Sequence, residues 1–134
     1  MSQKHTVHPR KKYILAVDDD GLVRKSLELL LRGAGYEPTV AGSGQEALGY
    51  LVQRHFDLLI TDIRMPGMDG LQVIQAVRDY THEMKRSPMP EIVMTAYNDE
   101  GVRRSVVQLG VQEFLIKPFK VEDFLKTIAR NLCR

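Results

Sequence analysis

The feature that most constrains the fold of this chain is an alternation of short apolar runs with longer amphipathic stretches. The apolar runs that we predict as strands are 13–17, 37–41, 57–61, 92–95 and 113–116. They are short enough for strands, whereas the stretches between them carry apolar residues at helical spacing. This pattern predicts βαβ units built on a parallel sheet.

The stretches between the runs contain helix start and stop signals. Ser43 followed by Glu46 predicts a capping box, Asn98 is the expected N-cap of a later helix, and Gly35 and Gly110 are natural helix ends. The predicted apolar face of the first helix is Val23, Leu27, Leu30, Leu31 and Ala34, and that of the second is Ala47, Leu48, Leu51 and Val52.

The predicted strand 57–61 reads Asp-Leu-Leu-Ile-Thr and shows no alternation of polar and apolar residues. A central parallel strand that is covered on both faces has this pattern. We therefore predict an α/β fold in which five parallel strands lie between two layers of helices, forming a three-layer α/β/α sandwich. The 134 residues fit one domain at 13–134.

Composition narrows the class of partner. The net charge of +2, from 19 basic and 17 acidic residues, is too balanced to predict a nucleic-acid or membrane surface over the whole chain. Residues 1–12 hold much of the positive excess and are predicted to form a disordered basic tail. Cys133 is the only cysteine, and no run approaches the roughly 20 apolar residues of a membrane span, so we expect a cytoplasmic protein.

Polar side chains follow four of the predicted strands. Asp18, Asp19 and Asp20 follow the first, Asp62 the third, Thr95 ends the fourth and Lys117 follows the fifth. Ligands of such sheets bind outside the carboxyl ends of the strands, where these carboxylates would repel one another without a cation. Oxygen ligands of this kind suit Mg²⁺. Aspartates at 18–20 could alternatively serve only as helix caps, but capping needs one aspartate and does not involve Asp62.

Four segments together resemble the response-regulator receiver family. They are Val-Asp-Asp-Asp at 17–20, Thr-Asp-Ile-Arg-Met-Pro-Gly-Met-Asp-Gly at 61–70, Met-Thr-Ala at 94–96 and Phe-Leu-Ile-Lys-Pro-Phe at 114–119. The resemblance covers about residues 13–132. It implies a flavodoxin-like fold with the sheet order 2-1-3-4-5.

The same resemblance implies a role for each matched residue. Asp62 would be the phosphoacceptor, and Asp18, Asp19 and Asp62 would bind Mg²⁺ together with the backbone carbonyl of Arg64. Thr95 would be the switch hydroxyl, Lys117 the lysine that contacts the phosphoryl oxygens, and Phe114 the aromatic switch. The Lys117–Pro118 peptide bond would be cis.

By resemblance, the chain is a signalling phosphoacceptor of a two-component system and not an enzyme. A histidine kinase or a histidine phosphotransfer protein would supply the phosphoryl group. Phosphorylation would alter a surface formed by the fourth helix, fifth strand and fifth helix, where the candidate contacts are Arg103, Arg104, Val106 and Val107. That surface would act on a downstream effector or a covalently linked output domain, and a homodimer is a further expectation; we expect no nucleic acid or membrane to bind this domain directly. The sequence does not distinguish a stand-alone regulator from part of a longer protein.

Two other functions fit parts of the pattern. A magnesium-dependent phosphatase would also use a strand-end aspartate such as Asp62, but such enzymes typically carry a second aspartate two positions later, where this chain has Arg64. A receiver that binds partners without phosphorylation is disfavoured by the joint presence of the acidic, threonine and lysine residues. The turn Gly42-Ser43-Gly44 lacks the full glycine fingerprint of a dinucleotide site.

Individual residues also have plainer explanations. Lys117 could be a surface lysine at a strand end, Thr95 an ordinary strand residue, and Phe114 a core side chain. Arg64 and Tyr97 could both point to solvent. If instead they cover the phosphoryl group, they would exclude water, and we expect slow self-dephosphorylation.

Overall fold

The computed structural model describes residues 10–97 and 99–133, and in this part of the chain strands and helices alternate strictly. The strands are β1 (Tyr13–Val17), β2 (Glu37–Ala41), β3 (Leu58–Asp62), β4 (Glu91–Thr95) and β5 (Glu113–Ile116). The helices are α1 (Gly21–Gly33), α2 (Gly44–Gln53), α3 (Gly70–Glu83), α4 (Glu100–Gln108) and α5 (Val121–Leu132). The observed strands lie within a residue of the predicted runs.

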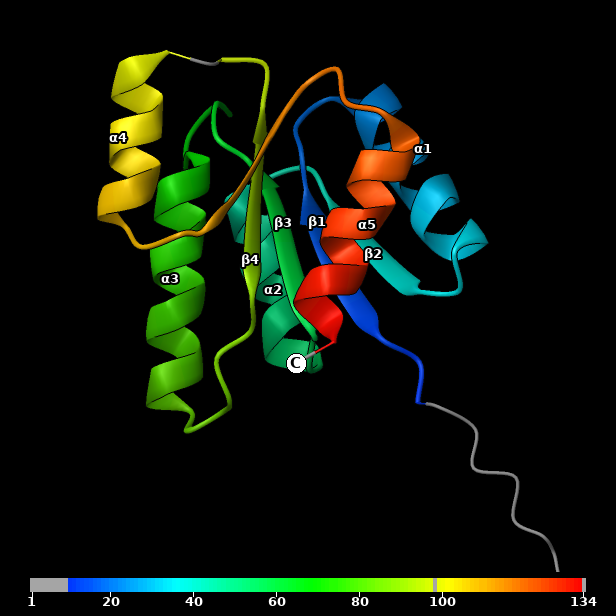
Figure 1. The fold of residues 1–134 in the computed structure, drawn as a ribbon. Coiled ribbons are helices and arrows are strands. Elements are labelled where there is room, and N and C mark those ends of the chain that lie inside the picture. The colour runs from blue at the N-terminus through cyan, green and yellow to red at the C-terminus, as the bar shows by residue number, and fades with distance from the viewer. Residues whose placement is uncertain (1–9, 98, 134) are drawn as a thin grey trace, which may run out of the picture.

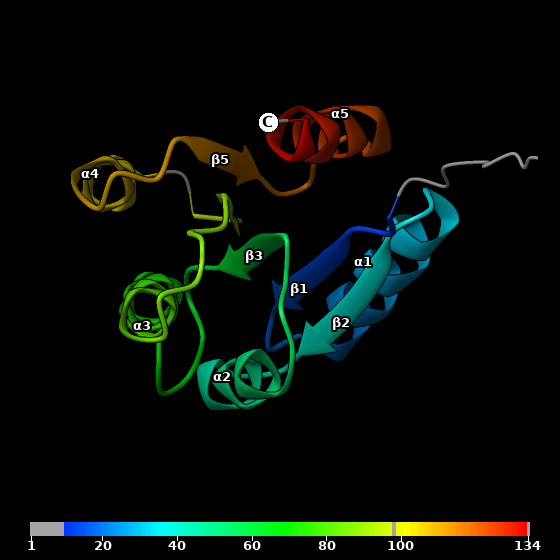
Figure 2. The ribbon, with the colours of Figure 1, turned by 90° about the horizontal axis from the view of Figure 1, so that it is seen from below.

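The strands form one parallel sheet with the order β2-β1-β3-β4-β5, which confirms the predicted fold class and sheet order. Helices α1 and α5 cover one face of the sheet, and α2, α3 and α4 cover the other (Figures 1 and 2). The predicted three-layer sandwich is therefore confirmed. Because all strands run in the same direction, their carboxyl ends lie along a single edge of the sheet.

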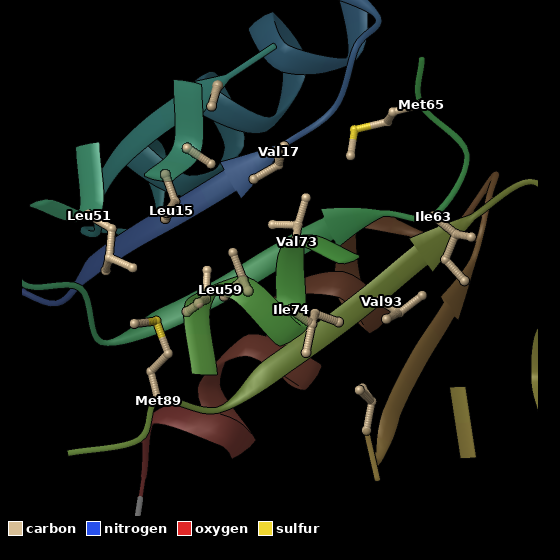
Figure 3. Close-up of a cluster of buried hydrophobic side chains, with 14 of the residues drawn as sticks. Leu15, Val17, Leu51, Leu59, Ile63, Met65, Val73, Ile74, Met89 and Val93 are labelled. Atoms are coloured by element: carbon tan, nitrogen blue, oxygen red, sulfur yellow. The ribbon is translucent and has the colours of Figure 1, made fainter. Parts of the chain in front are cut away.

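Alternate residues of the central strands supply two separate cores. Ile14, Ala16, Leu58 and Ile60 pack on the α1 and α5 side, with Phe124 of α5 among them. Their chain neighbours in β1, β3 and β4 pack on the other side against α2 and α3; Figure 3 shows Val73 and Ile74 of α3 in the same cluster as Leu15, Leu59 and Val93. Full burial stabilises each such leucine or isoleucine by about 1.5 to 3 kcal/mol, so the lack of alternation in β3 reflects burial on both faces.

The helix ends show which local signals act as predicted. Asp20 caps α1 by accepting hydrogen bonds from the backbone N–H groups of Leu22 and Val23, and Gly35 follows the helix with a φ of 94°. Ser43 caps α2 through the N–H of Glu46 at 3.1 Å. The Glu46 carboxylate, however, accepts from the N–H of Gly42 at 2.6 Å, so only half of the predicted capping box forms.

Three predicted details differ from the structure or lie outside it. Val52 was placed on the apolar face of α2 but is 59% exposed, because the helix turns that position away from α3 and the sheet. Val106, a predicted surface contact, is 2% exposed and packs in the core beneath α4. Asn98 lies outside the described residues, and Asp99 caps α4 by accepting from the N–H of Val102.

The predicted basic tail lies mostly at residues 1–9, outside the described residues. Of its last residues, Arg10 lies 3.4 Å from the carboxylate of Asp57, and the carbonyl of Lys12 accepts a hydrogen bond from the N–H of Glu37. Among the helices of residues 10–97 and 99–133, none is long and apolar enough to cross a membrane.

Candidate functional site

The predicted polar residues gather at the carboxyl edge of the sheet. Asp18 directly follows β1, Asp62 is the last residue of β3, Thr95 is the last residue of β4, and Lys117 directly follows β5. The parallel register places Asp62 opposite Met94 and Thr95 opposite Ile116. Residues up to 99 positions apart in the sequence therefore come within contact of one another at this edge.

Three carboxylates form the centre of the site. Asp18, Asp19 and Asp62 each offer one oxygen atom, and these atoms all lie within 4.8 Å of one another. Asp18 is fully buried, Asp62 is nearly so, and Asp19 is exposed. Like charges this close repel strongly where water is excluded, so the cluster requires positive charge beside it.

Lys117 supplies positive charge to the cluster. Its Nζ atom donates to Asp18 Oδ2 at 2.7 Å and to Asp62 Oδ2 at 3.1 Å. Burial lowers the pKa of the ammonium group, but the hydrogen bonds to Asp18 and Asp62 outweigh burial and raise the pKa overall. One lysine thus holds two buried carboxylates and remains charged, which leaves the cluster of three aspartates with net negative charge.

Asp62 has a raised pKa. Burial is the largest cause, and it outweighs the hydrogen bond and the attraction from Lys117, which act in the opposite direction. Asp18 adds to the rise by charge repulsion. The ionised form of Asp62 is therefore held in a setting that disfavours it, as is expected for a carboxylate whose charge is to be neutralised by a ligand.

Backbone donors fix the orientation of the two buried carboxylates. Asp18 Oδ1 accepts from the N–H of Asp20 at 2.9 Å, and Asp62 Oδ1 accepts from the N–H of Ile63 at 2.7 Å. Arg24 of α1 donates to the carbonyl of Asp18 at 2.9 Å. Each buried aspartate thus has one oxygen held by the backbone and the other held by Lys117.

Gly70 allows the start of α3 to approach Asp62. Its N–H donates to the carbonyl of Ile63 at 2.7 Å, and a Cβ atom at this position would lie 2.0 Å from the carbonyl oxygen of Asp62. No real Cβ contact is that short, so only glycine fits here. Asp69 caps the same helix in a complete capping box with Gln72, which fixes the loop between β3 and α3.

Thr95 and Phe114 lie on the β4 and β5 side of the site. Thr95 is fully buried, and its Oγ1 accepts a hydrogen bond from the N–H of Tyr97 at 3.1 Å. Phe114 is half-buried against the core beneath α4, with the guanidinium of Arg103 5.1 Å from its ring. The Lys117–Pro118 peptide bond is cis, as the resemblance implied, and the Lys117 N–H donates to the carbonyl of Thr95 at 2.9 Å.

Arg64 makes contacts that the sequence did not predict. Its guanidinium lies 4.4 Å from the ring centroid of Tyr97 and 3.4 Å from a carboxylate oxygen of Asp99, the residue that caps α4. Arg64 and Tyr97 therefore contact each other, joining the loop after β3 to the loop after β4. A hollow of about 740 Å³ lies beside them, between the loop after β3 and α4.

The carboxylates at this edge suit a hard divalent cation. Asp18, Asp19 and Asp62 offer only oxygen atoms, and these lie close enough together to bind one ion. The net negative charge that remains after pairing with Lys117 also favours the binding of a divalent cation. The sequence predicted these residues and placed Gly70 in the matched segment 61–70, but it gave no signal for the contacts of Arg24 and Asp99.

The sequence matches the family model described as "Response regulator receiver domain" over residues 14–129. Among curated relatives, it is 40% identical to the DNA-binding transcriptional regulator NtrC of Klebsiella pneumoniae over 117 residues, which are 87% of this chain and 24% of NtrC. It is 34% identical to the transcriptional regulatory protein FixJ of Bradyrhizobium diazoefficiens over 92% of this chain and 58% of FixJ. The chain thus spans only about a quarter to three-fifths of these relatives' length.

Solved structures of similar proteins have the same fold. The chemotaxis protein CheY4 of Vibrio cholerae superposes with a TM-score of 0.83 at 32% identity, covering 92% of this chain and all of CheY4. A response regulator receiver protein from Pseudomonas putida gives a TM-score of 0.81 at 29% identity, covering 92% of this chain and 99% of that protein.

Proposed function

The chain belongs to the response regulator receiver domain family of two-component signalling, and on that premise we propose that Asp62 accepts the phosphoryl group. The observation that carries this proposal is the shared position of Asp18, Asp19, Asp62 and Lys117 at one edge of the sheet. Asp62 is the only one of the three clustered aspartates that ends a central strand, and it contacts Lys117 at 3.1 Å. The donor would be a histidine kinase or a histidine phosphotransfer protein.

The proposed reaction transfers a phosphoryl group to one carboxylate oxygen of Asp62. A new phosphorus–oxygen bond forms as the bond between phosphorus and the donor's leaving group breaks, and the donor keeps that bond's electron pair. Lys117, which already contacts Asp62 Oδ2, would then neutralise a phosphoryl oxygen. Such transfers depend on positioning and on charge neutralisation more than on proton transfer.

Asp18, Asp19 and Asp62, with the backbone carbonyl of Arg64, would hold Mg²⁺. When bound, this ion supplies further neutralisation of the phosphoryl oxygens. The backbone N–H groups of Asp20 and Ile63 would keep the two buried carboxylates oriented throughout the transfer. The chain assists its own phosphorylation in this way without acting as an enzyme on other substrates.

Thr95 would respond to the new phosphoryl group. Its buried hydroxyl accepts from the N–H of Tyr97 and has its own proton to donate, so it could turn to a phosphoryl oxygen. That movement would pull on the loop between β4 and α4 and let Phe114 repack. The surface of α4, β5 and α5 would carry the signal to an effector or a linked output domain, with the exposed side chains of Arg103, Arg104 and Val107 as candidate contacts.

Incubation with Mg²⁺ and acetyl phosphate tests the proposal. Intact mass should increase by about 80 Da, the mass of one phosphoryl group. Asp57→Asn is a matched control, because Asp57 immediately precedes β3 and Asp62 ends it. Asp62→Asn should abolish the adduct and Asp57→Asn should keep it; an adduct that survives Asp62→Asn would refute the assignment.

A magnesium-dependent phosphatase is the second candidate, and one residue weakens it. Arg64 occupies the position where such enzymes carry their second aspartate, and its guanidinium contacts Tyr97 and Asp99. We therefore expect no turnover of p-nitrophenyl phosphate. Sustained release of nitrophenol that depends on Asp62 would favour the phosphatase instead.

Arg64 and Tyr97 should slow the loss of the phosphoryl group. They contact each other beside the site, with each residue about half exposed, and in that position they would restrict the approach of water to the proposed acyl phosphate. We expect Arg64→Ala to shorten the half-life of the phosphorylated protein about threefold to tenfold, as measured by the decay of the mass adduct. A half-life of seconds in the unmodified protein would contradict this shielding role.

A further inference from the structure

A second hollow lies at the opposite edge of the sheet from the aspartate site. It has a volume of about 720 Å³ and lies between the C-terminal half of α3, the connection 84–90 and the first residue of β4. In Figure 1 this connection is the light green loop at the foot of the molecule, whereas the strands end at the top. Its size falls within the range of small-molecule sites.

The floor of this hollow is apolar. Val77 of α3, Pro88 and Met89 line it, and Val77 and Met89 are buried. Figure 3 shows Met89 reaching toward Leu59 at the start of the sheet, so the floor is continuous with the core. An aliphatic chain entering here would gain burial without displacing a charged group.

One wall is rigid and electrically neutral. Arg78 donates to both carboxylate oxygens of Glu91, at 2.8 and 2.7 Å, and also to the carbonyl of Leu109 at 2.6 Å. The bidentate pair satisfies the charges of both residues. Glu91 therefore does not neutralise the other cations around the hollow.

Those other cations are Lys85 and Arg86, with His82 beside them. Among residues 10–97 and 99–133, neither Lys85 nor Arg86 lies within ion-pair distance of a carboxylate. Arg86 donates to the carbonyl of Leu51 at 2.9 Å and lies 5.1 Å from the ring of Tyr80, so its position is fixed while its charge is uncompensated. The rim of the hollow is consequently positive.

Lys85 has a backbone conformation that normally favours glycine. Its φ is 55°, and it follows the C-cap residue of α3, where the N–H of Arg86 bonds to the carbonyl of Thr81. Helices commonly place glycine at this position because a side chain is disfavoured there. Because strained backbone positions cluster at ligand-binding sites, this conformation makes Lys85 a candidate ligand-binding residue.

We propose that this hollow is a binding site for a carboxylate with a short apolar chain. The chain would lie on Val77, Pro88 and Met89, and the carboxylate would pair with Lys85 and Arg86 at the rim. The source could be a free metabolite or the C-terminal carboxylate of a peptide ending in an apolar residue. The aspartate site has the opposite charge and would repel the same ligand.

A titration of isotopically labelled protein with sodium hexanoate at constant ionic strength tests this proposal by NMR. Amide signals of residues 81–91 should shift, and hexanamide, which has the same chain without the charge, should bind at least about fivefold more weakly. A tripeptide ending in leucine, compared with its C-terminal amide, tests the peptide source. Tighter binding of the tripeptide would identify a peptide terminus, and tighter binding of hexanoate a small metabolite.

The Lys85→Gly variant tests the role of the lysine in binding without destabilising the fold. The substitution removes the charge and places glycine where the backbone favours it, so the variant should fold at least as stably as the parent. We expect it to bind hexanoate about fivefold more weakly, whereas Lys25→Gln on α1 should bind it unchanged. Phosphorylation by acetyl phosphate should be normal in Lys85→Gly.

The proposal is overturned by any of three results. The first is that hexanoate causes no shifts at residues 81–91 up to about 20 mM, a concentration well above the dissociation constant of a specific site. The second is that hexanamide binds as tightly as hexanoate, which would exclude a role for the positive rim. The third is that Lys85→Gly binds hexanoate as tightly as the parent protein, which would exclude a role for the lysine.

Discussion

The carboxylates at the two edges of the sheet have opposite electrostatic surroundings. At the amino edge, Glu91 has its own arginine, and Asp57 accepts the N–H of Tyr13 at 2.8 Å and lies near Arg10 and His55. At the carboxyl edge, Asp18 and Asp62 share Lys117, and Asp19 adds a third charge. Glu91 and Asp57 at the amino edge are therefore each paired with a cation or a backbone donor, whereas the three carboxylates at the carboxyl edge share one lysine and keep net negative charge.

This difference assigns separate roles to the same residue type. A carboxylate with its own donors contributes to stability, whereas carboxylates that repel one another cost stability, and such clusters are common at binding and catalytic sites. The same strand shows both cases, since Asp57 immediately precedes β3 and Asp62 ends it. Four measurements test whether the carboxylates at the two edges differ in this way.

The largest expected effect is the response to Mg²⁺. At a concentration about 100 times its dissociation constant, Mg²⁺ should raise the free energy of unfolding by about 2.7 kcal/mol, because it binds only the folded cluster. Urea unfolding with and without the ion measures this effect. The Asp62→Asn variant should lose most of this Mg²⁺-dependent stabilisation, and the Glu91→Gln variant should keep all of it. An equal loss in both variants would show that the two edges do not differ.

Next in size is the removal of a satisfied charge at the amino edge. Glu91→Gln leaves the Arg78 guanidinium without its charged partner in a half-buried position, and we expect a loss of about 2 kcal/mol in the free energy of unfolding. Urea unfolding measures this loss, with Glu122→Gln on the exposed face of α5 as control. A change below about 0.5 kcal/mol would mean that the pair is no stronger than an ordinary surface ion pair.

Removal of a charge from the carboxyl edge should raise the free energy of unfolding, not lower it. Burial raises the pKa of the Asp62 carboxyl, so its ionised form destabilises the folded protein at neutral pH. Asp62→Asn removes that charge, keeps an oxygen for the N–H of Ile63 and leaves Lys117 paired with Asp18. We expect a gain of about 1 kcal/mol without Mg²⁺. Thermal unfolding measures this gain, and a loss of stability would contradict the interpretation of the carboxyl edge as strained.

The smallest expected effect concerns the exposed pair at the amino edge. Arg10 is largely exposed where it approaches Asp57, and the 3.4 Å contact should contribute little. Arg10→Ala should change the free energy of unfolding by less than about 0.5 kcal/mol. A larger loss in urea unfolding would show that Asp57 depends on Arg10 and not mainly on the N–H of Tyr13.

Much of the fold followed from local patterns. Apolar runs of strand length, helical spacing between them and glycines such as Gly35 and Gly110 were sufficient to predict the order of elements and the layers. These features depend on a residue and its near neighbours, and both glycines do have positive φ values, of 94° and 83°. Predictions of individual faces were less accurate: Val52 is exposed and Val106 is buried, because neighbouring elements decide which part of an amphipathic helix is covered.

The same distinction between local pattern and packing applies to the candidate site. The sequence by itself placed Asp18, Asp19, Asp62, Thr95 and Lys117 at strand ends, because parallel strands bring every carboxyl end to one edge. Only the tertiary structure determined that Lys117 bonds to Asp18 across 99 positions, that Gly70 must lack a side chain beside Asp62, and that Arg64 contacts Asp99. Strand ends are fixed by local pattern, whereas pairing between side chains depends on distances that exist only after the elements have packed.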